Sequence, residues 1–314
     1  MIRALCLNPA IDRIYMIDAF QTGRQYRDNT PRLSVGGKGI NVARACALLG
    51  EPVTVYGFIG GVNGCLVAEE TSRCGCINRF IEVEGETRVT INIIDNALKK
   101  ETEIIERGVS VSEDDVRRLM EALIDDIVEG DLVICSGILI GGVPADMYSR
   151  ISHICEAAGA KCFLDSNGDH LQQSIGGRYH LFKPNRNELL NMFAAEDTRD
   201  LDAIGLLARQ ALSSSMESVL VSLGRNGALF VTDNVCYKID VPVVTVDSTI
   251  GCGDCTVAGF AVGVSRGLTV PNTLRLAAAC GVANAASPGI CDFSLNDMEI
   301  YRSQITLHPI SLDN

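Results

Sequence analysis

The sequence contains no apolar run long enough to span a bilayer. Its first residues, "MIRALCLNPA", lack the basic segment and cleavage site of a secretory signal, so we expect a cytoplasmic protein without a membrane partner. Basic residues are also in deficit, because 27 lysines and arginines stand against 39 aspartates and glutamates, for a net charge of −12. Binding to a phosphate backbone needs a basic surface, so nucleic acid is excluded as a partner.

Histidine is scarce as well: His153, His170, His180 and His308 are dispersed among the expected helices and loops, and we interpret them as structural or surface residues. Cysteine is abundant, but the 13 residues are odd in number and scattered through apolar stretches such as "LVICSG" and "GAKCFLD". Buried, reduced thiols explain this distribution better than a disulfide framework. The 314 residues, 47% hydrophobic and 21% charged, suffice for one large α/β domain or two modest ones.

Strand-like and helix-like patterns alternate along most of the chain. Continuous valine, isoleucine and leucine runs between helices predict a parallel sheet that is covered on both faces. We expect strands at residues 2–7, 52–60, 131–137, 160–166, 179–185, 218–224 and 242–246, with a hairpin over 228–240. We expect helices at residues 39–49, 112–128, 144–158, 186–193, 200–213, 253–266 and 271–286, the last two closing the chain. Ser112 and Asp115 resemble a capping box at the start of one of them.

Two segments, near residues 12–33 and 80–107, do not follow the alternation of strands and helices. Residues 87–95 alternate between apolar and polar, turn at Asn96 and are followed by the alternating residues 101–106, which predicts a hairpin with one wet face. We therefore divide the chain into a core and a small β lid. The core takes residues 1–11, 34–79 and 108–314, and the lid takes residues 12–33 and 80–107.

The stretch "VDSTIGCGDCTVAG" (246–259) places an aspartate behind glycine-rich backbone at the start of an apolar helix. The first N–H groups of a helix have no internal partner, and small residues let a ligand approach them. Gly251, Cys252 and Gly253 therefore predict an anion site suited to phosphate. Asp254 would lie beside the anion, where a carboxylate can accept the proton of an attacking hydroxyl. A helix cap without chemistry is the alternative.

Known phosphate loops do not fit this stretch, because the Walker pattern is absent and Thr256 occupies the last glycine position of GxGxxG. Cys252 and Cys255 do form a CxxC pair, which is typical of a thiol-redox protein or a zinc site. No second CxxC and no histidine pair completes a metal set, and the surrounding glycines fit anion binding better.

A basic island lies near the amino end. Residues 23–44, "GRQYRDNTPRLSVGGKGINVAR", carry a net charge of +4 in an otherwise acidic chain, which suggests a small anionic ligand. A solvated charge cluster is the alternative. Gly37 and its neighbouring glycines open a helix, Lys38 adds a mobile cation, and Asn41 offers both a donor and an acceptor. The combination suits a phosphorylated sugar.

Taken together, these residues resemble the ribokinase/PfkB family of carbohydrate kinases, and within it the branch of 1-phosphofructokinases and tagatose-6-phosphate kinases. The resemblance covers nearly the whole chain and rests on seven motifs in family order. They are "LNPAIDR" (7–13), "GGKGINVA" (36–43), "TRVTIN" (87–92), "CSGIL" (135–139), "FKPNRNEL" (182–189), "VSLGRNGAL" (221–229) and "STIGCGD" (248–254). The resemblance implies a three-layer α/β/α core with a mostly parallel sheet, a small β-sheet lid, a sugar site between them and ATP beside it.

The resemblance also implies roles for individual residues. Asp254 matches the catalytic base, and Gly251, Cys252 and Gly253 match the anion hole that neutralises charge in the transition state. The residues that match substrate contacts are Asp12, Gly37, Lys38, Asn41, Arg88, Arg27 and Ser136. The residues that match nucleotide contacts are Lys183, Asn185, Ser222, Gly224, Gly251, Gly253 and Gly289. Glu188, with Asn185 acting through water, matches the group that holds Mg²⁺. The resemblance also implies a K⁺ site near Gly289 and a homodimer formed through the lid.

The basic island argues against a neutral acceptor, because a free sugar or a nucleoside carries no negative charge for these residues to bind. We expect fructose 1-phosphate, phosphorylated by ATP at O6, with tagatose 6-phosphate or fructose 6-phosphate as alternatives. A non-catalytic sugar-phosphate sensor on the same scaffold is a further alternative. Retention of Asp254, Lys183, Asn185 and Glu188 argues against it, since a sensor needs no base.

The sequence departs from the family pattern near the expected site. Cys252 replaces the usual alanine of the anion hole, and Cys255 replaces the usual serine after the aspartate. Ile138 stands where relatives carry a serine that can help to hold the substrate. These changes bear on the identity of the substrate and leave the transfer step intact.

Overall fold

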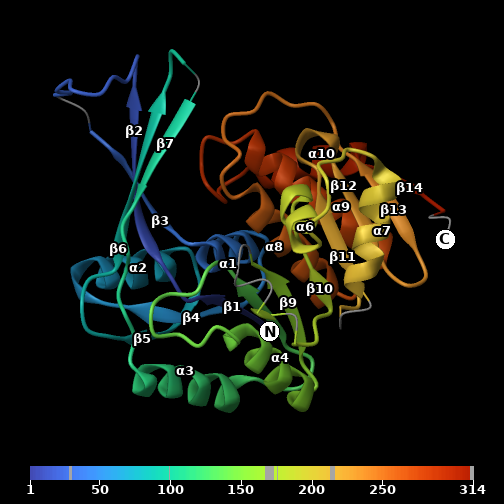
Figure 1. The fold of residues 1–314 in the computed structure, drawn as a ribbon, viewed down its shortest axis with the longest axis horizontal. Helices are drawn as coiled ribbons and strands as arrows, with labels where there is room; N and C mark the ends of the chain where they lie inside the picture. Colours follow the sequence, from blue (N-terminus) through green and yellow to red (C-terminus); the bar gives the residue numbers. More distant parts are fainter. Residues whose placement is uncertain (28–29, 99, 167–172, 175, 213–215, 312–314) are drawn as a thin grey trace.

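Two separate sheets organise the computed structural model, which describes residues 1–27, 30–98, 100–166, 173–174, 176–212 and 216–311 (Figure 1). The larger sheet has ten described strands. In spatial order they are β14 (Thr306–Pro309), β13 (Cys236–Asp240), β12 (Ala228–Val231), β11 (Val219–Ser222), β10 (Leu181–Phe182), β9 (Lys161–Asp165), β8 (Leu132–Ser136), β1 (Ile2–Cys6), β4 (Val53–Ile59) and β5 (Ile77–Glu82). Strands β11 to β5 run parallel, and β12, β13 and β14 add an antiparallel edge.

Alternate residues of the central strands enter two separate hydrophobic cores. In β1, Ile2 and Ala4 belong to one core, whereas Leu5 belongs to the other. The first core is covered by α1 (Lys38–Leu48), α2 (Gly61–Arg73), α8 (Cys252–Ser265), α9 (Val270–Ala285) and α10 (Leu295–Gln304). The second is covered by α3 (Glu113–Asp126), α4 (Met147–Ala158), α6 (Arg186–Met192) and α7 (Leu201–Leu212). Helices therefore cover both faces of the sheet, and the fold is the ribokinase-like α/β arrangement expected from the sequence.

The smaller sheet rises from one side of the body (Figure 1). Its described strands are, in spatial order, β3 (Arg32–Gly36), β2 (Ala10–Ile17), β6 (Arg88–Asp95) and β7 (Lys100–Ile105). β6 and β7 pair antiparallel, as the alternating pattern predicts. Two of the expected boundaries between core and lid, at residues 11/12 and 79/80, fall inside strands. All of β2, from Ala10 on, pairs in the small sheet, and all of β5, up to Glu82, pairs in the large sheet.

Each expected helix lies within a few residues of its expected position, and Ser112 and Asp115 form the expected capping box. Helix α2 was not expected. The strand expected at 242–246 is wrong, because residues 241–246 lie outside the described strands and Val243 is fully exposed. Its place beside β13 is taken by β14 from the end of the chain. The two apolar helices also do not close the chain, since α10 and β14 follow them. None of the helices that the structure describes is both long and apolar enough to cross a membrane.

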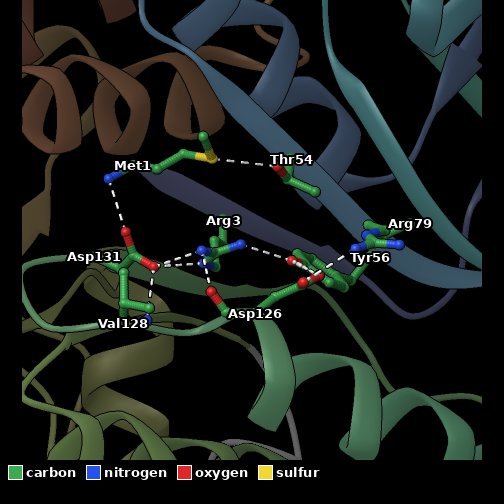
Figure 2. Close-up of polar contacts among 8 residues, drawn as sticks. All are labelled: Met1, Arg3, Thr54, Tyr56, Arg79, Asp126, Val128 and Asp131. Carbon is green, nitrogen blue, oxygen red and sulfur yellow. Dashed lines mark hydrogen bonds and ion pairs between the residues drawn. The ribbon is translucent and has the colours of Figure 1, made fainter.

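The amino ends of the central strands are joined by a polar network (Figure 2). Asp131 accepts hydrogen bonds from the amine of Met1 at 2.8 Å and from Nε of Arg3 at 2.7 Å. Arg3 also donates to the hydroxyl of Tyr56, which donates to Asp126 at the end of α3. This network fastens β1, β4 and α3 together at the end of the sheet opposite the carboxyl ends of its strands.

Candidate active site

The turn that carries Asp254 opens α8. Gly251 is the residue before the helix, with φ of 79°, in the left-handed region that favours glycine. A Cβ built on Gly251 would lie 3.0 Å from Sγ of Cys291, so a side chain would be both strained and crowded. The N–H of Cys252 makes only a long contact of 3.4 Å, to the carbonyl of Thr249. The small residues and the weak bond of this N–H keep the start of α8 accessible to a ligand.

Asp254 lies in the first turn of α8 and is only 6% exposed. Its Oδ2 accepts a hydrogen bond of 2.8 Å from Nδ2 of Asn41, in α1. Burial, and then the charge of Asp165, raise the pKa of Asp254 to about 6, while Lys38, Asn41 and Lys183 act in the opposite direction. A carboxylate whose pKa lies this close to neutrality suits a general base.

Two lysines meet on one buried carboxylate beside Asp254. Oδ1 of Asp165, the last residue of β9, lies 3.1 Å from Nζ of Lys38 and 3.3 Å from Nζ of Lys183. Burial alone would raise the pKa of Asp165, but the two ammonium groups hold it below its ordinary value. Burial likewise opposes the charge of Lys38, yet Asp165, Asp254 and Glu188 raise the pKa of that lysine overall. Lys38 is therefore held as a cation.

Lys183 also reaches the anion-binding turn. A Cβ built on Gly253 would lie 3.3 Å from Nζ of Lys183, so the ammonium group stands against the first turn of α8. The structure thus brings together Lys38 and Asn41 of α1, Lys183 after β10 and Asp254 of α8, from three separate segments of the chain. Asp165, which no sequence pattern marks, joins them from the end of β9.

A small cavity of about 150 Å³ lies next to these residues. Its lining includes four residues expected at or near the sugar, Gly37, Lys38, Arg88 and Ser136, together with Ile138. Asn8 lines it as well and accepts a hydrogen bond of 2.9 Å from Nε of Arg88. The cavity is therefore basic on two sides, with Lys38 on the core and Arg88 on the small sheet.

Three polar atoms at this site are buried without a hydrogen-bond partner: Oγ of Ser136, Oδ1 of Asn41 and Oδ2 of Asp165. Buried polar atoms are rarely left unpaired, so these atoms point to a polar ligand. Asp12 lies on the small sheet with its carboxylate against Gly36, where a Cβ would approach it to 1.9 Å. Burial raises the pKa of Asp12 to about 6, whereas Arg88 and Thr90 lower it.

A second, larger pocket of about 500 Å³ opens beyond the ends of β10 and β11. Asn185, Ser222 and Gly224 line it together, as expected for residues that contact a nucleotide, and Arg199 and Arg225 add positive charge. Gly289 does not line this pocket; it is buried in the loop behind Gly251. Arg27 is exposed and does not line the small cavity that contains Lys38 and Arg88.

Asn185 and Glu188 form a reciprocal cap at the start of α6. Oδ1 of Asn185 accepts from the N–H of Glu188 at 2.9 Å, and Oε2 of Glu188 accepts from the N–H of Asn185 at 2.7 Å. One carboxylate oxygen of Glu188 is not used in this cap. Within the described part of the chain, no three histidine, cysteine or acidic side chains gather as a ready-made metal cage.

The cysteines of the turn are poor candidates for thiol chemistry. All 13 cysteines are free thiols, and Cys255 is fully buried. Burial raises the pKa of Cys252, and the neighbouring Cys291 and Asp254 add to this effect. Because thiolates are the reactive form, this environment opposes the redox interpretation of the CxxC pair.

The chain is similar to known carbohydrate kinases over most of its length. The ribokinase-like fold identifies a sugar kinase, an enzyme that transfers a phosphoryl group to a hydroxyl. Residues 6–297 match the model of the pfkB family carbohydrate kinases, and the chain belongs to this family.

Several relatives cover almost the whole chain. It is 31% identical to the tagatose-6-phosphate kinase of Staphylococcus epidermidis, covering 91% of this chain and 92% of the relative. It is also 31% identical to the 1-phosphofructokinase of Bacillus subtilis, with 91% and 93% covered. Phosphofructokinase-2 from Escherichia coli, solved in complex with fructose-6-phosphate, superposes with a TM-score of 0.88 at 26% identity, over 96% of this chain and 98% of that one.

Proposed function

We propose that this protein is an ATP-dependent kinase that phosphorylates a ketohexose phosphate, converting fructose 1-phosphate to fructose 1,6-bisphosphate. One observation carries the proposal: Lys38 and Arg88 face the same small cavity, next to Asn41 and Asp254. Two cations beside one cavity suit a substrate that already carries a phosphate, whereas a neutral sugar would make no use of the positive charge that Arg88 adds beside Lys38. The relatives named 1-phosphofructokinase and tagatose-6-phosphate kinase support the same substrate class.

In this proposal the core of the site performs an in-line transfer. Asp254 accepts the proton of the attacking hydroxyl, whose oxygen forms a bond to the γ-phosphorus as the bond to the leaving ADP oxygen breaks. The N–H groups of Gly251, Cys252 and Gly253, with the ammonium of Lys183, stabilise the charge that spreads over the phosphoryl oxygens. Asn41 holds the base in place, and Asp12 and Ser136 bind sugar hydroxyls.

The residues around Glu188 fit a hydrated divalent metal. Mg²⁺ keeps several waters and needs only one or two carboxylates besides the phosphates, so the lack of a closed cage among the described residues is no obstacle. The unused oxygen of Glu188, with Asn185 acting through water, would hold it. When bound, Mg²⁺ neutralises phosphate charge and orients the phosphates of ATP.

Further parts of the proposal rest on the resemblance to relatives. The small sheet, with expected bounds 12–33 and 80–107, acts as a lid over the sugar, and Arg27 reaches the substrate's phosphate. Gly289 belongs to the loop that borders adenine and a K⁺ site; phosphofructokinase-2 from E. coli has been solved with potassium. A homodimer through the lid and a cytoplasmic location complete the proposal. The E. coli protein has also been solved as a tetramer in an inhibited form.

A coupled assay that follows ADP tests the proposal. We would compare kcat/KM for fructose 1-phosphate, tagatose 6-phosphate, fructose 6-phosphate, ribose and adenosine. Fructose 1-phosphate is expected to give the highest value, and a higher value for tagatose 6-phosphate would reassign the acceptor within the same mechanism. The Arg88→Met variant is expected to raise KM for the preferred sugar phosphate at least tenfold and to leave KM for ATP nearly unchanged. Highest kcat/KM for ribose or adenosine would overturn the phosphosugar assignment.

A further inference from the structure

Asn284 lies at the carboxyl end of α9, next to the amino end of α8. The two helices pack very closely, since a Cβ on Gly259 of α8 would lie 2.8 Å from Cα of Ala277 in α9. This packing brings the end of one helix against the start of the other. The side chain of Asn284 is fully buried there, behind the turn that precedes Asp254.

The amide of Asn284 uses both of its polar ends. Nδ2 donates to the carbonyl of Ile250 at 2.8 Å and lies 3.3 Å from Sγ of Cys252. Oδ1 accepts from the N–H of Cys291 at 2.7 Å. These partners fix which end of the amide is nitrogen, because the reverse orientation would set donor against donor and acceptor against acceptor.

These contacts hold the anion-binding turn on two sides, through Ile250 and Cys252 in the turn itself and through Cys291 in the loop behind it. Ile250 and Cys252 flank Gly251, whose left-handed backbone aims the next N–H groups out of the helix. Cys291 lies on the loop that packs against Gly251, and its own φ is 53°, in the region that few residues other than glycine adopt. A single side chain thus ties together two unusual backbone conformations at the start of α8.

We propose that Asn284 is a positioning residue for phosphoryl transfer, which holds the N–H groups of Gly251, Cys252 and Gly253 in the orientation that the transition state needs. The inference rests on the proposed function of this turn as the anion hole. Fixed donors stabilise developing charge because they need not reorganise during the reaction, so a loosened turn weakens the transition state more than the bound substrates. Asn284 itself exchanges no proton and forms no bond to the substrates.

The Asn284→Ala variant tests this role. We expect kcat to fall about 10- to 100-fold, the range produced by a displacement of about 1 Å, while KM for fructose 1-phosphate and for ATP changes less than about threefold. Binding of ADP with aluminium fluoride and the sugar phosphate, which imitates the transition state, should weaken by a similar factor. Binding of a non-hydrolysable ATP analogue should not. Asn272→Ala, on the exposed first turn of the same helix, is the matched control.

A second, more conservative variant separates a loss of positioning from a loss of folding. Asn284→Asp keeps the volume and the acceptor for Cys291 but loses the donor to Ile250, and it should lower kcat at least tenfold. If both variants fold, as judged by thermal melting, and both retain kcat within twofold, the inference is overturned. An equal loss of affinity for both nucleotide complexes would also overturn it. If the wild type phosphorylates none of the sugar phosphates, or if Asp254→Asn turns over normally, the proposed function itself fails, whatever the Asn284 variants do.

Discussion

Asn41 and Asp254 are 213 residues apart in the sequence, yet the amide of one donates a hydrogen bond of 2.8 Å to the carboxylate of the other. The bond joins α1 to α8, the helix that carries the proposed base. It sets the direction in which the carboxylate faces and, in the proposed mechanism, leaves the second oxygen of Asp254 for the substrate's hydroxyl.

The Asp254→Asn variant should fold and bind ATP almost normally, because asparagine has the same volume and can still accept from Asn41. It cannot take up a proton, so kcat should fall about 10²- to 10⁴-fold. Steady-state kinetics with nucleotide binding would measure this. Asp233→Asn, at an exposed hairpin turn, serves as the control and should behave like the wild type. Near-normal turnover of the Asp254 variant would remove this residue from the mechanism.

Turnover should depend on pH through the same carboxylate. Burial and Asp165 raise the pKa of Asp254 to about 6, and only the ionised form can act as a base. We therefore expect kcat to be constant above this value and to fall tenfold per pH unit below it. Asn41→Ala removes a hydrogen bond that lowers this pKa, so the descending limb should move to higher pH. A profile whose limb stays in place in that variant would contradict the assignment.

Asp165 should prove essential because it pairs with both Lys38 and Lys183. Asp165→Asn leaves the ammonium groups of Lys38 and Lys183 without their shared counter-charge in a buried site. Removing one partner of a buried ion pair typically costs about 3–5 kcal/mol, so both stability and activity should fall. Urea unfolding would measure the loss. Adding Lys183→Met should restore part of the stability but not the activity; strictly additive losses of stability would show that the two groups do not interact.

The polar network at the far end of the sheet makes a separate prediction about stability (Figure 2). Burial alone would raise the pKa of Asp131, but hydrogen bonds from the amine of Met1, Val128 and Arg3 lower it overall. Its contribution is therefore complete above the ordinary carboxyl pKa of about 4 and is lost as the pH falls through the lower folded value. Asp131→Asn should reduce the free energy of unfolding at pH 7 by about 3 kcal/mol and leave kcat unchanged.

Denaturant unfolding at several pH values would check this prediction. The difference between wild type and variant should shrink as the pH falls below about 4, because protonation removes the same charge from the wild type. Asp125→Asn, exposed on α3, is the matched control and should change stability very little. A difference that stays constant down to pH 2 would mean that the charge of Asp131 is not what matters.

The local signals in the sequence account for most of the elements and for the residues at their ends, although α2, α10 and β14 were not expected. Continuous apolar runs predicted the parallel strands, and glycine before an apolar run predicted the start of α8. The sequence does not mark Asp165 or Asn284 in this way, because their partners lie far away along the chain. An acidic residue at the carboxyl end of a parallel strand was the available signal for Asp165. The strand expected at 242–246 failed because strand propensity cannot tell which segment will occupy a sheet edge.

Only residues 7–9 separate β1 of the large sheet from β2 of the small one, and within them Asn8 accepts from Arg88. Arg88 belongs to the small sheet, whereas Lys38 belongs to the body. A sugar phosphate bound by both side chains, as proposed, would bridge the two sheets across this three-residue link, so the product could leave only after at least one of the two contacts broke.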